Sequence, residues 1–203
     1  MQVKKKLVHD NIVENAKKEF LANGYEHASM RKIAKDSQIT VGNIYRYFDN
    51  KEALFKYIVE PAYELVIALV ETIETAADRN SNISVFEDPS VLTEKVDKFI
   101  DIAREYRSEL IILLEGANGS RFEGSKRQIT LFLENRMKAA IDHLTEVNKY
   151  KVGESYIAHV IVHAFMEGLI EIIKFDDFEK MEEMSHQFVN LIFRDYIKRI
   201  VTE

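Results

Sequence analysis

The sequence predicts an all-α protein, and two features favour that fold class. Only two prolines and seven glycines occur among 203 residues, so residues that break helices or build hairpins are scarce. Apolar residues recur at the spacing of helices and do not alternate as they do in half-buried strands. A polar, turn-rich segment over residues 78–90 separates two such runs. We expect a small helical domain over residues 1–50 and a larger one over residues 51–203.

The composition also limits the kinds of site and the location of the protein. Cysteine is absent, which excludes disulfides, thiolate metal ligands and cysteine nucleophiles. No run approaches the roughly 18 uninterrupted apolar residues that a membrane span needs. The lysines near the start precede no apolar block of signal-peptide length. We therefore expect a cytoplasmic protein without membrane contacts.

Charge is distributed unevenly along the chain. Through residue 59 there are 11 lysines and arginines against 7 acidic residues, whereas the remainder has 17 against 27. The formal net charge of −6 averages these two parts. Because a polyanion is attracted by a local basic surface and not by the net charge, the N-terminal part is the place where nucleic acid would bind.

Short helical patterns in the first 50 residues predict a helix-turn-helix. Apolar residues from 7 to 21 have helical spacing, and Asn23-Gly24 is expected to end that helix. Ser29 can cap a second helix. Thr40 can cap a third helix, which should run to about Phe48. Two short helices joined by a turn of three residues are typical of this motif.

Longer helices are expected in the rest of the chain. One begins at Lys51, after an Asp49-Asn50 cap, and continues past residue 70 with Pro61 inside it. Pro89 suits the first turn of the next helix. The expected ranges are 90–105, 107–116, 125–147, 153–174 and 178–201.

The third helix carries side chains suited to reading DNA. Ile44 and Phe48, four residues apart, should face the core. Asn43 can pair with adenine through two hydrogen bonds, Val41 can touch a thymine methyl group, and Gly42 allows the backbone to approach the bases. Tyrosine, arginine and lysine side chains beside them can bind phosphates. The alternative is a small helical core with an aromatic outer face, because single exposed tyrosines and arginines are common.

The stretch FLANGYEHASMRKIAKDSQITVGNIYRYFDNKEALF resembles the DNA-binding domain of the TetR family of bacterial transcriptional regulators. The shared motifs are a GY after the first helix, an S-x-x-x-IA helix and a G-x-I-Y-x-x-F-x-x-K recognition segment. The resemblance covers about residues 7–55. It implies that Arg31, Val41, Gly42 and Asn43 face bases, and that Ser29, Thr40, Tyr45, Arg46, Tyr47 and Lys51 face phosphates.

One position departs from the family pattern. Members often have glycine in the turn where this chain has Gln38. If that residue is left-handed, a side chain there costs on the order of 1 kcal/mol.

The resemblance also implies a homodimer formed through the last two helices and a regulatory domain that binds a small molecule. Both helices have broad apolar faces, which suits contact with a core and with a second subunit, although a bundle within one chain is the alternative. Aromatic and polar side chains are the candidates for lining an effector pocket, or else plain core. They are Phe99, Tyr106, Phe122, Phe132, Tyr156, His159, His163 and Phe165.

A metal site and a catalytic site find little support. His159, His163 and Glu167 share one helical face, but Glu167 lies about 12 Å along the axis from His159, so one ion is not expected to bind all three. The chain has no glycine-rich phosphate loop, G-x-S-x-G elbow or H-E-x-x-H helix. We expect no metal, no cofactor and no enzymatic activity.

The sequence therefore predicts a dimeric repressor that binds a palindromic operator in double-stranded DNA and is released by an effector. One alternative is a DNA-binding or activating protein of the same fold without an effector. A second is a helical enzyme or binding protein in which the helix-turn-helix is incidental.

Overall fold

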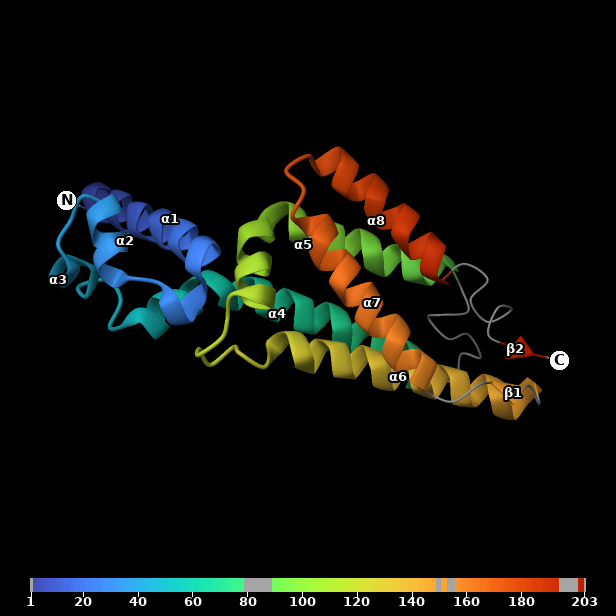
Figure 1. Ribbon diagram of the computed structural model, residues 1–203. Helices are drawn as coiled ribbons and strands as arrows, with labels where there is room; N and C mark the ends of the chain where they lie inside the picture. Colours follow the sequence, from blue (N-terminus) through green and yellow to red (C-terminus); the bar gives the residue numbers. More distant parts are fainter. Residues whose placement is uncertain (1, 79–88, 149–150, 153–155, 194–200, 203) are drawn as a thin grey trace. The chain divides into compact units, whose positions relative to one another are not determined.

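The fold was analysed in a computed structural model, which describes residues 2–78, 89–148, 151–152, 156–193 and 201–202. Figure 1 shows the helices of this described part. They are α1 (Gln2–His27), α2 (Met30–Asp36), α3 (Val41–Ile44), α4 (Lys51–Asp78), α5 (Pro89–Glu115), α6 (Ser125–Asn148), α7 (Tyr156–Ile173) and α8 (Phe178–Phe193). The all-α prediction is confirmed.

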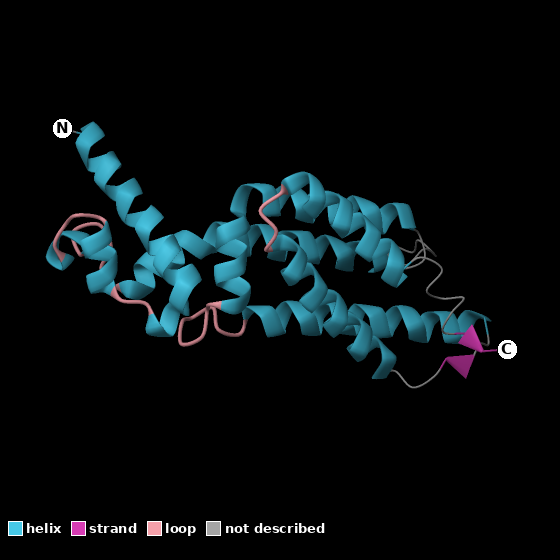
Figure 2. Cartoon of the chain, turned by 45° about the horizontal axis from the view of Figure 1, so that its top comes forward, coloured by secondary structure: helices cyan, strands magenta, loops and turns pink. Residues whose placement is uncertain are grey.

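Two very short strands form the only sheet among the described residues (Figure 2). Strand β1 (Lys151–Val152) pairs antiparallel with β2 (Val201–Thr202), and Lys151 lies opposite Thr202. The prediction of a final helix over residues 178–201 is therefore wrong at its end, because residue 201 is in a strand. Residues 194–200 lie outside the described part.

The chain forms two compact units that are not consecutive in sequence. The first contains Met1–Glu64 and Tyr106–Lys126, and the second contains Leu65–Glu105 and Arg127–Glu203. Helices α4 and α5 therefore each contribute residues to both units. The functional division at residue 50 stays a prediction, since compactness alone does not test it.

The first unit has one hydrophobic core shared by α1 to α5. Its fully buried side chains include Phe20 of α1, Ile33 of α2, Ile44 of α3 and Phe55 of α4. Residues 112–122 complete this core. Burying a side chain such as Phe55 contributes roughly 1.5–3 kcal/mol to folding. The core explains why the short helices α2 and α3, which are too short to be stable alone, keep a defined position.

Glycines allow α1 and the end of α5 to approach closely within this unit. Gly24 has a φ of 65°, in the left-handed region, and it bends the chain within α1. The backbone N–H of Tyr25 donates to the carbonyl oxygen of Gly116 over 2.6 Å. A Cβ atom on Gly24 would lie 3.3 Å from that oxygen, so a larger residue would press against it. The predicted stop at Asn23-Gly24 thus marks a kink after which helical turns continue to His27.

The second unit is built from the remaining parts of α4 and α5 with α6, α7 and α8. Figure 1 shows α7 and α8 beside each other, connected by a short loop. The buried residues of α7 are Ala158, Val162, Met166, Leu169, Ile170, Ile172 and Ile173. By length and composition alone α7 could cross a membrane, but this buried stripe is typical of a core helix.

Candidate nucleic-acid interface

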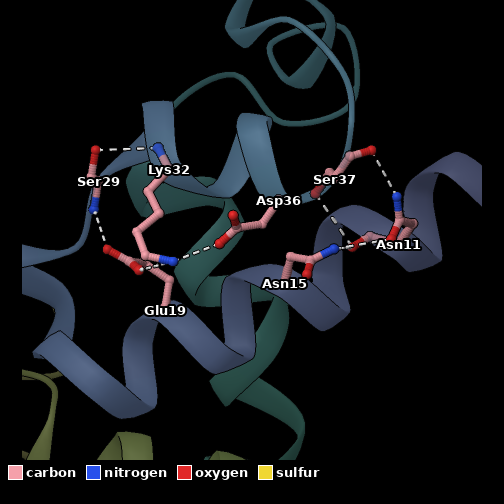
Figure 3. Close-up of polar contacts among 7 residues, drawn as sticks. All are labelled: Asn11, Asn15, Glu19, Ser29, Lys32, Asp36 and Ser37. Atoms are coloured by element: carbon pink, nitrogen blue, oxygen red, sulfur yellow. Dashed lines mark hydrogen bonds and ion pairs between the residues drawn. The ribbon is translucent and has the colours of Figure 1, made fainter.

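A buried carboxylate holds the N-terminus of α2 (Figure 3). Glu19 of α1 is 4% exposed, and its Oε1 accepts a hydrogen bond from the backbone N–H of Ser29 over 3.0 Å. The Ser29 hydroxyl in turn accepts from the N–H of Lys32 over 3.3 Å and caps α2. The Lys32 ammonium lies 3.7 Å from Oε2 of Glu19. These contacts set the position at which α2 starts on α1.

Glu19 was not identified from the sequence, although a signal was present. Ile12, Ala16 and Glu19 are spaced at i, i+4 and i+7, which places the acid on the buried stripe of its helix. A charged residue in such a stripe is expected to have a specific partner, because burying an unpaired charge is costly. Here the partners are the backbone of Ser29 and the ammonium of Lys32.

The turn between α2 and α3 is attached to α1 as well (Figure 3). The side-chain amide of Asn11 donates to the carbonyl oxygen of Ser37 over 2.9 Å, and Asn15 donates to the carbonyl oxygen of Asn11 over 2.9 Å. Gln38 follows with a φ of 58°. The turn therefore requires a left-handed residue, and glutamine occupies that position at a cost of about 1–2 kcal/mol.

Helix α3 is shorter than predicted. Thr40 caps it as expected, since its hydroxyl accepts from the N–H of Asn43 over 3.2 Å. The helix ends at Ile44, however, and the N–H groups of Arg46 and Tyr47 bond to carbonyls three residues earlier, over 3.2 and 2.8 Å. Such tighter turns are common where an α-helix ends. The spacing of apolar residues did not reveal this, because Phe48 is buried although it follows the end of the helix.

The predicted core side of this segment is confirmed, since Ile44 is 0% and Phe48 6% exposed. Among the residues predicted to face DNA, six are exposed and four are half-buried. The exposed ones are Ser29, Arg31, Thr40, Gly42, Tyr45 and Arg46, and the half-buried ones are Val41, Asn43, Tyr47 and Lys51.

Arg31, Arg46 and Gly42 lie on this surface, and no contact within the described part of the chain explains why these residue types occur there. Arg31 and Arg46 form no ion pair with any described residue, so both guanidinium groups can bind an external anion. A Cβ atom on Gly42 would meet nothing within 4 Å. Glycine inside a helix costs roughly 0.5–1 kcal/mol relative to alanine, and the fold does not require it here.

Lys51 has a different role from the predicted phosphate contact. Its ammonium group donates to the carbonyl oxygens of Tyr25, Glu26 and Ala28 over 2.7, 3.2 and 3.4 Å. It also lies 4.4 Å from the centroid of the Tyr25 ring. An ammonium group has three N–H donors, and all three have acceptors within the protein. Lys51 therefore satisfies the backbone at the end of α1 and has no free donor for DNA.

The residues predicted to line an effector pocket are divided between the two units. Tyr106 and Phe122 belong to the first. Phe122 is 5% exposed and packs against Phe55 and Tyr63, with ring centroids 6.2 and 5.4 Å away, so the structure gives it a core position. The other six, Phe99, Phe132, Tyr156, His159, His163 and Phe165, belong to the second unit. An effector pocket formed by these six stays a prediction.

Within the second unit, the two histidines face an acid that the sequence did not indicate. Glu134 of α6 is buried, and its Oε2 lies 3.0 Å from Nδ1 of His159 and 3.9 Å from Nε2 of His163. Glu134 precedes His159 by 25 residues, on another helix. Only tertiary packing brings them together, whereas Glu167, the acid considered from sequence, is exposed on α7.

Residues 12–58 match the model of the bacterial regulatory proteins of the tetR family. This match includes most of α1, all of α2, the left-handed turn, α3 and the start of α4 described above. This part of the chain is a DNA-binding segment of the TetR-family type.

Comparison with individual TetR-family and related proteins agrees with this assignment. The chain is 27% identical over 154 residues to a probable HTH-type transcriptional regulator, YttP, of Bacillus subtilis, a match that covers 75% of this chain and 62% of YttP. The matched part spans less than two thirds of the length of each of three curated relatives.

Two solved structures show that the fold is shared along nearly the whole chain. PfmR of Thermus thermophilus, a TetR-family regulator, has a TM-score of 0.56 and 20% identity, over 90% of this chain and 97% of PfmR. AibR, solved with isovaleryl coenzyme A and operator DNA, has a TM-score of 0.58 and 18% identity, over 92% of this chain and 98% of AibR. The second unit therefore also has the fold of TetR-family proteins.

Proposed function

We propose that this protein is a homodimeric, cytoplasmic transcriptional repressor of the TetR family that binds a palindromic operator and is released by a small molecule. The exposed surface of α2 and α3 carries this proposal. It combines two guanidinium groups that pair with no described residue and Asn43 beside Gly42, at the N-terminus of a helix that can enter the major groove.

Gly42 is the most informative residue of this surface. The fold would accept a side chain there, and glycine lowers helix stability, so the reason for it lies outside the chain. Close approach of the helix backbone to the bases provides such a reason. In this arrangement Val41 and Asn43 contact base edges, while Arg46 and Tyr45 bind phosphates and orient the helix.

Dimerisation is supported by apolar side chains that the second unit leaves exposed. Tyr156 and Val160 of α7 are 66% and 47% exposed, and Leu191 of α8 is 72% exposed. A second copy of the chain would cover them and place two reading helices about 34–36 Å apart, one turn of DNA or a multiple of it. Such a dimer matches the two-fold symmetry of a palindrome.

Release requires an effector that binds better to a dimer with a different spacing of the reading helices. Both α4, which contains Pro61, and α5 connect the second unit to the first through the chain itself. AibR was solved with an acyl-coenzyme A, so acyl-coenzyme A compounds are the first class to screen.

Binding of genomic DNA fragments, measured by fluorescence anisotropy at several salt concentrations, tests this proposal. We expect preferred fragments with palindromic sites, and an affinity that falls steeply between about 50 and 200 mM salt. Asn43→Ala should reduce the preference for the best site by roughly 1–3 kcal/mol, which is about 5- to 150-fold.

Asn118→Ala is the matched control, because Asn118 is an exposed asparagine of the same unit. It should bind DNA as the wild type does. Equal site preference in the wild type and in Asn43→Ala would contradict the assignment of base contacts. An operator affinity unaffected by every acyl-coenzyme A tested would refute that effector class and leave the DNA-binding result intact.

A further inference from the structure

Glu134, His159 and His163 form a cluster of possible metal ligands between α6 and α7. One ligand atom from each residue lies within 4.8 Å of those of the other two. The two histidines are four residues apart on α7, so their rings stand on the same helical face, with centroids 4.1 Å apart. Both direct a ring nitrogen at the same carboxylate oxygen, Oε2 of Glu134.

The distances suit coordination of a single ion. Ligand atoms bound at about 2.0–2.2 Å in a tetrahedral site lie roughly 3.3–3.5 Å from one another. The separations of Oε2 from the two ring nitrogens, 3.0 and 3.9 Å, lie on either side of that value. Small rotations of the imidazole rings, one half-buried and one exposed, would bring the three atoms around one cation.

Neighbouring side chains orient Glu134 and His159 as possible metal ligands. The Lys138 ammonium donates to Oε1 of Glu134 over 2.6 Å, which leaves Oε2 facing the histidines. The Tyr156 ring stacks on His159, with centroids 5.3 Å apart. Contacts of this kind orient ligands in metal sites.

We propose that Oε2 of Glu134 and one ring nitrogen each of His159 and His163 bind a divalent transition-metal ion. Two imidazoles and one carboxylate favour Zn²⁺ or Co²⁺ over Mg²⁺ or Ca²⁺, which prefer oxygen ligands. A neutral imidazole nitrogen binds such an ion through its lone pair. Three protein ligands leave a fourth position for water or another small ligand.

A simple ion pair between Glu134 and His159 is the competing explanation for this cluster. It accounts for the 3.0 Å contact but gives no role to His163, which is 48% exposed in its side chain and still faces Oε2. Removal of His163 therefore separates the two explanations. A metal site would bind its ion more weakly without His163, whereas the ion pair between Glu134 and His159 does not require His163.

The test uses the full chain, treated with a chelator and then titrated with Co²⁺ and with Zn²⁺ in the absence of DNA. We expect one strong site per chain, with visible absorption bands of four-coordinate Co²⁺ that Zn²⁺ abolishes. His163→Ala should lower the affinity at least tenfold, as should His159→Ala. Because His163 is exposed, its replacement should leave the circular dichroism and the melting temperature unchanged.

Glu167→Gln and His186→Ala serve as controls, since both residues lie in the same unit but outside the cluster. Both variants should bind Co²⁺ as the wild type does. Wild-type affinity in His163→Ala, or the absence of a Co²⁺ spectrum in the wild type, would overturn the proposal. Neither result depends on DNA binding, so failure of this proposal is distinct from failure of the repressor function.

Discussion

The ammonium group of Lys51 donates a hydrogen bond over 2.7 Å to the carbonyl oxygen of Tyr25, 26 residues earlier in the chain. This contact joins the start of α4 to the end of α1, where helix carbonyls lack partners within their own helix. A cation at that end of a helix also interacts favourably with the helix dipole. Lys51, the lysine of the family motif, thus stabilises the packing of α1 against α4 next to the helices that bind DNA.

Lys51→Met should therefore reduce stability and not the electrostatic part of DNA binding. Methionine keeps an apolar chain but removes three charge-assisted hydrogen bonds, so we expect a loss of about 1–3 kcal/mol in the free energy of unfolding, measured in urea. The salt dependence of DNA binding should stay unchanged. Lys56→Met, which removes a partly exposed pair with Glu60, should cost less than about 1 kcal/mol. A wild-type stability combined with a salt slope lower by about 1 would restore Lys51 as a phosphate contact.

Gln38→Gly should stabilise the protein. Gln38 has a φ of 58°, a conformation that glycine adopts without the steric cost of a Cβ atom. The greater freedom of glycine in the unfolded chain offsets part of this gain, so we expect a net increase of roughly 0.5–1 kcal/mol in urea unfolding. Gln38→Ala, which keeps the Cβ atom, should change the free energy of unfolding by only a few tenths of a kcal/mol. If Gln38→Gly were instead less stable than the wild type, the glutamine side chain itself would contribute to the stability of the fold.

Gly168→Ala should disturb the packing of α7 against α8. A Cβ atom on Gly168 would lie 2.2 Å from Cζ of Phe188, whose ring is stacked on Phe165 with centroids 5.9 Å apart. Inserting a methyl group into such a contact costs about 1–3 kcal/mol, visible as a lower melting temperature. In the Phe188→Ala background the same change should cost much less. A double-mutant cycle without this coupling would mean that the ring moves aside freely.

Alkaline pH should destabilise the first unit through Tyr25. Burial, followed by the hydrogen bond to Glu52, raises the pKa of the Tyr25 hydroxyl from 10.0 to about 12. The folded protein therefore keeps a proton that the unfolded chain loses, so this stabilisation is complete below pH 10 and is lost between pH 10 and 12. Tyr25→Phe should unfold with a weaker pH dependence in that range. If the stability of the wild type and of Tyr25→Phe depended on pH in the same way, Tyr25 would be excluded as the cause. The absorbance of ionised tyrosine provides a direct check.

The helices and the DNA-reading motif could be predicted because they depend on local sequence. Helical spacing, the caps at Ser29 and Thr40 and the buried pair Ile44 and Phe48 involve residues within a few positions of one another. The family motif drew attention to Gln38 but left its conformation open, and only the structure gives its φ of 58°. The end of α3 at Ile44 was not predicted, because apolar spacing cannot separate an α-helical turn from a tighter one.

An all-α protein with a TetR-like reading segment could be predicted from the amino-acid sequence, since periodicity, capping and motif spacing are properties of neighbouring residues. The three-dimensional fold was needed to find that Lys51 binds the end of α1, that Glu19 anchors Ser29, and that Glu134 faces two histidines. Each of these contacts joins residues of different structural elements. Their partners are chosen by packing of the hydrophobic core, and packing brings together charges whose separation along the chain carries no periodic signal.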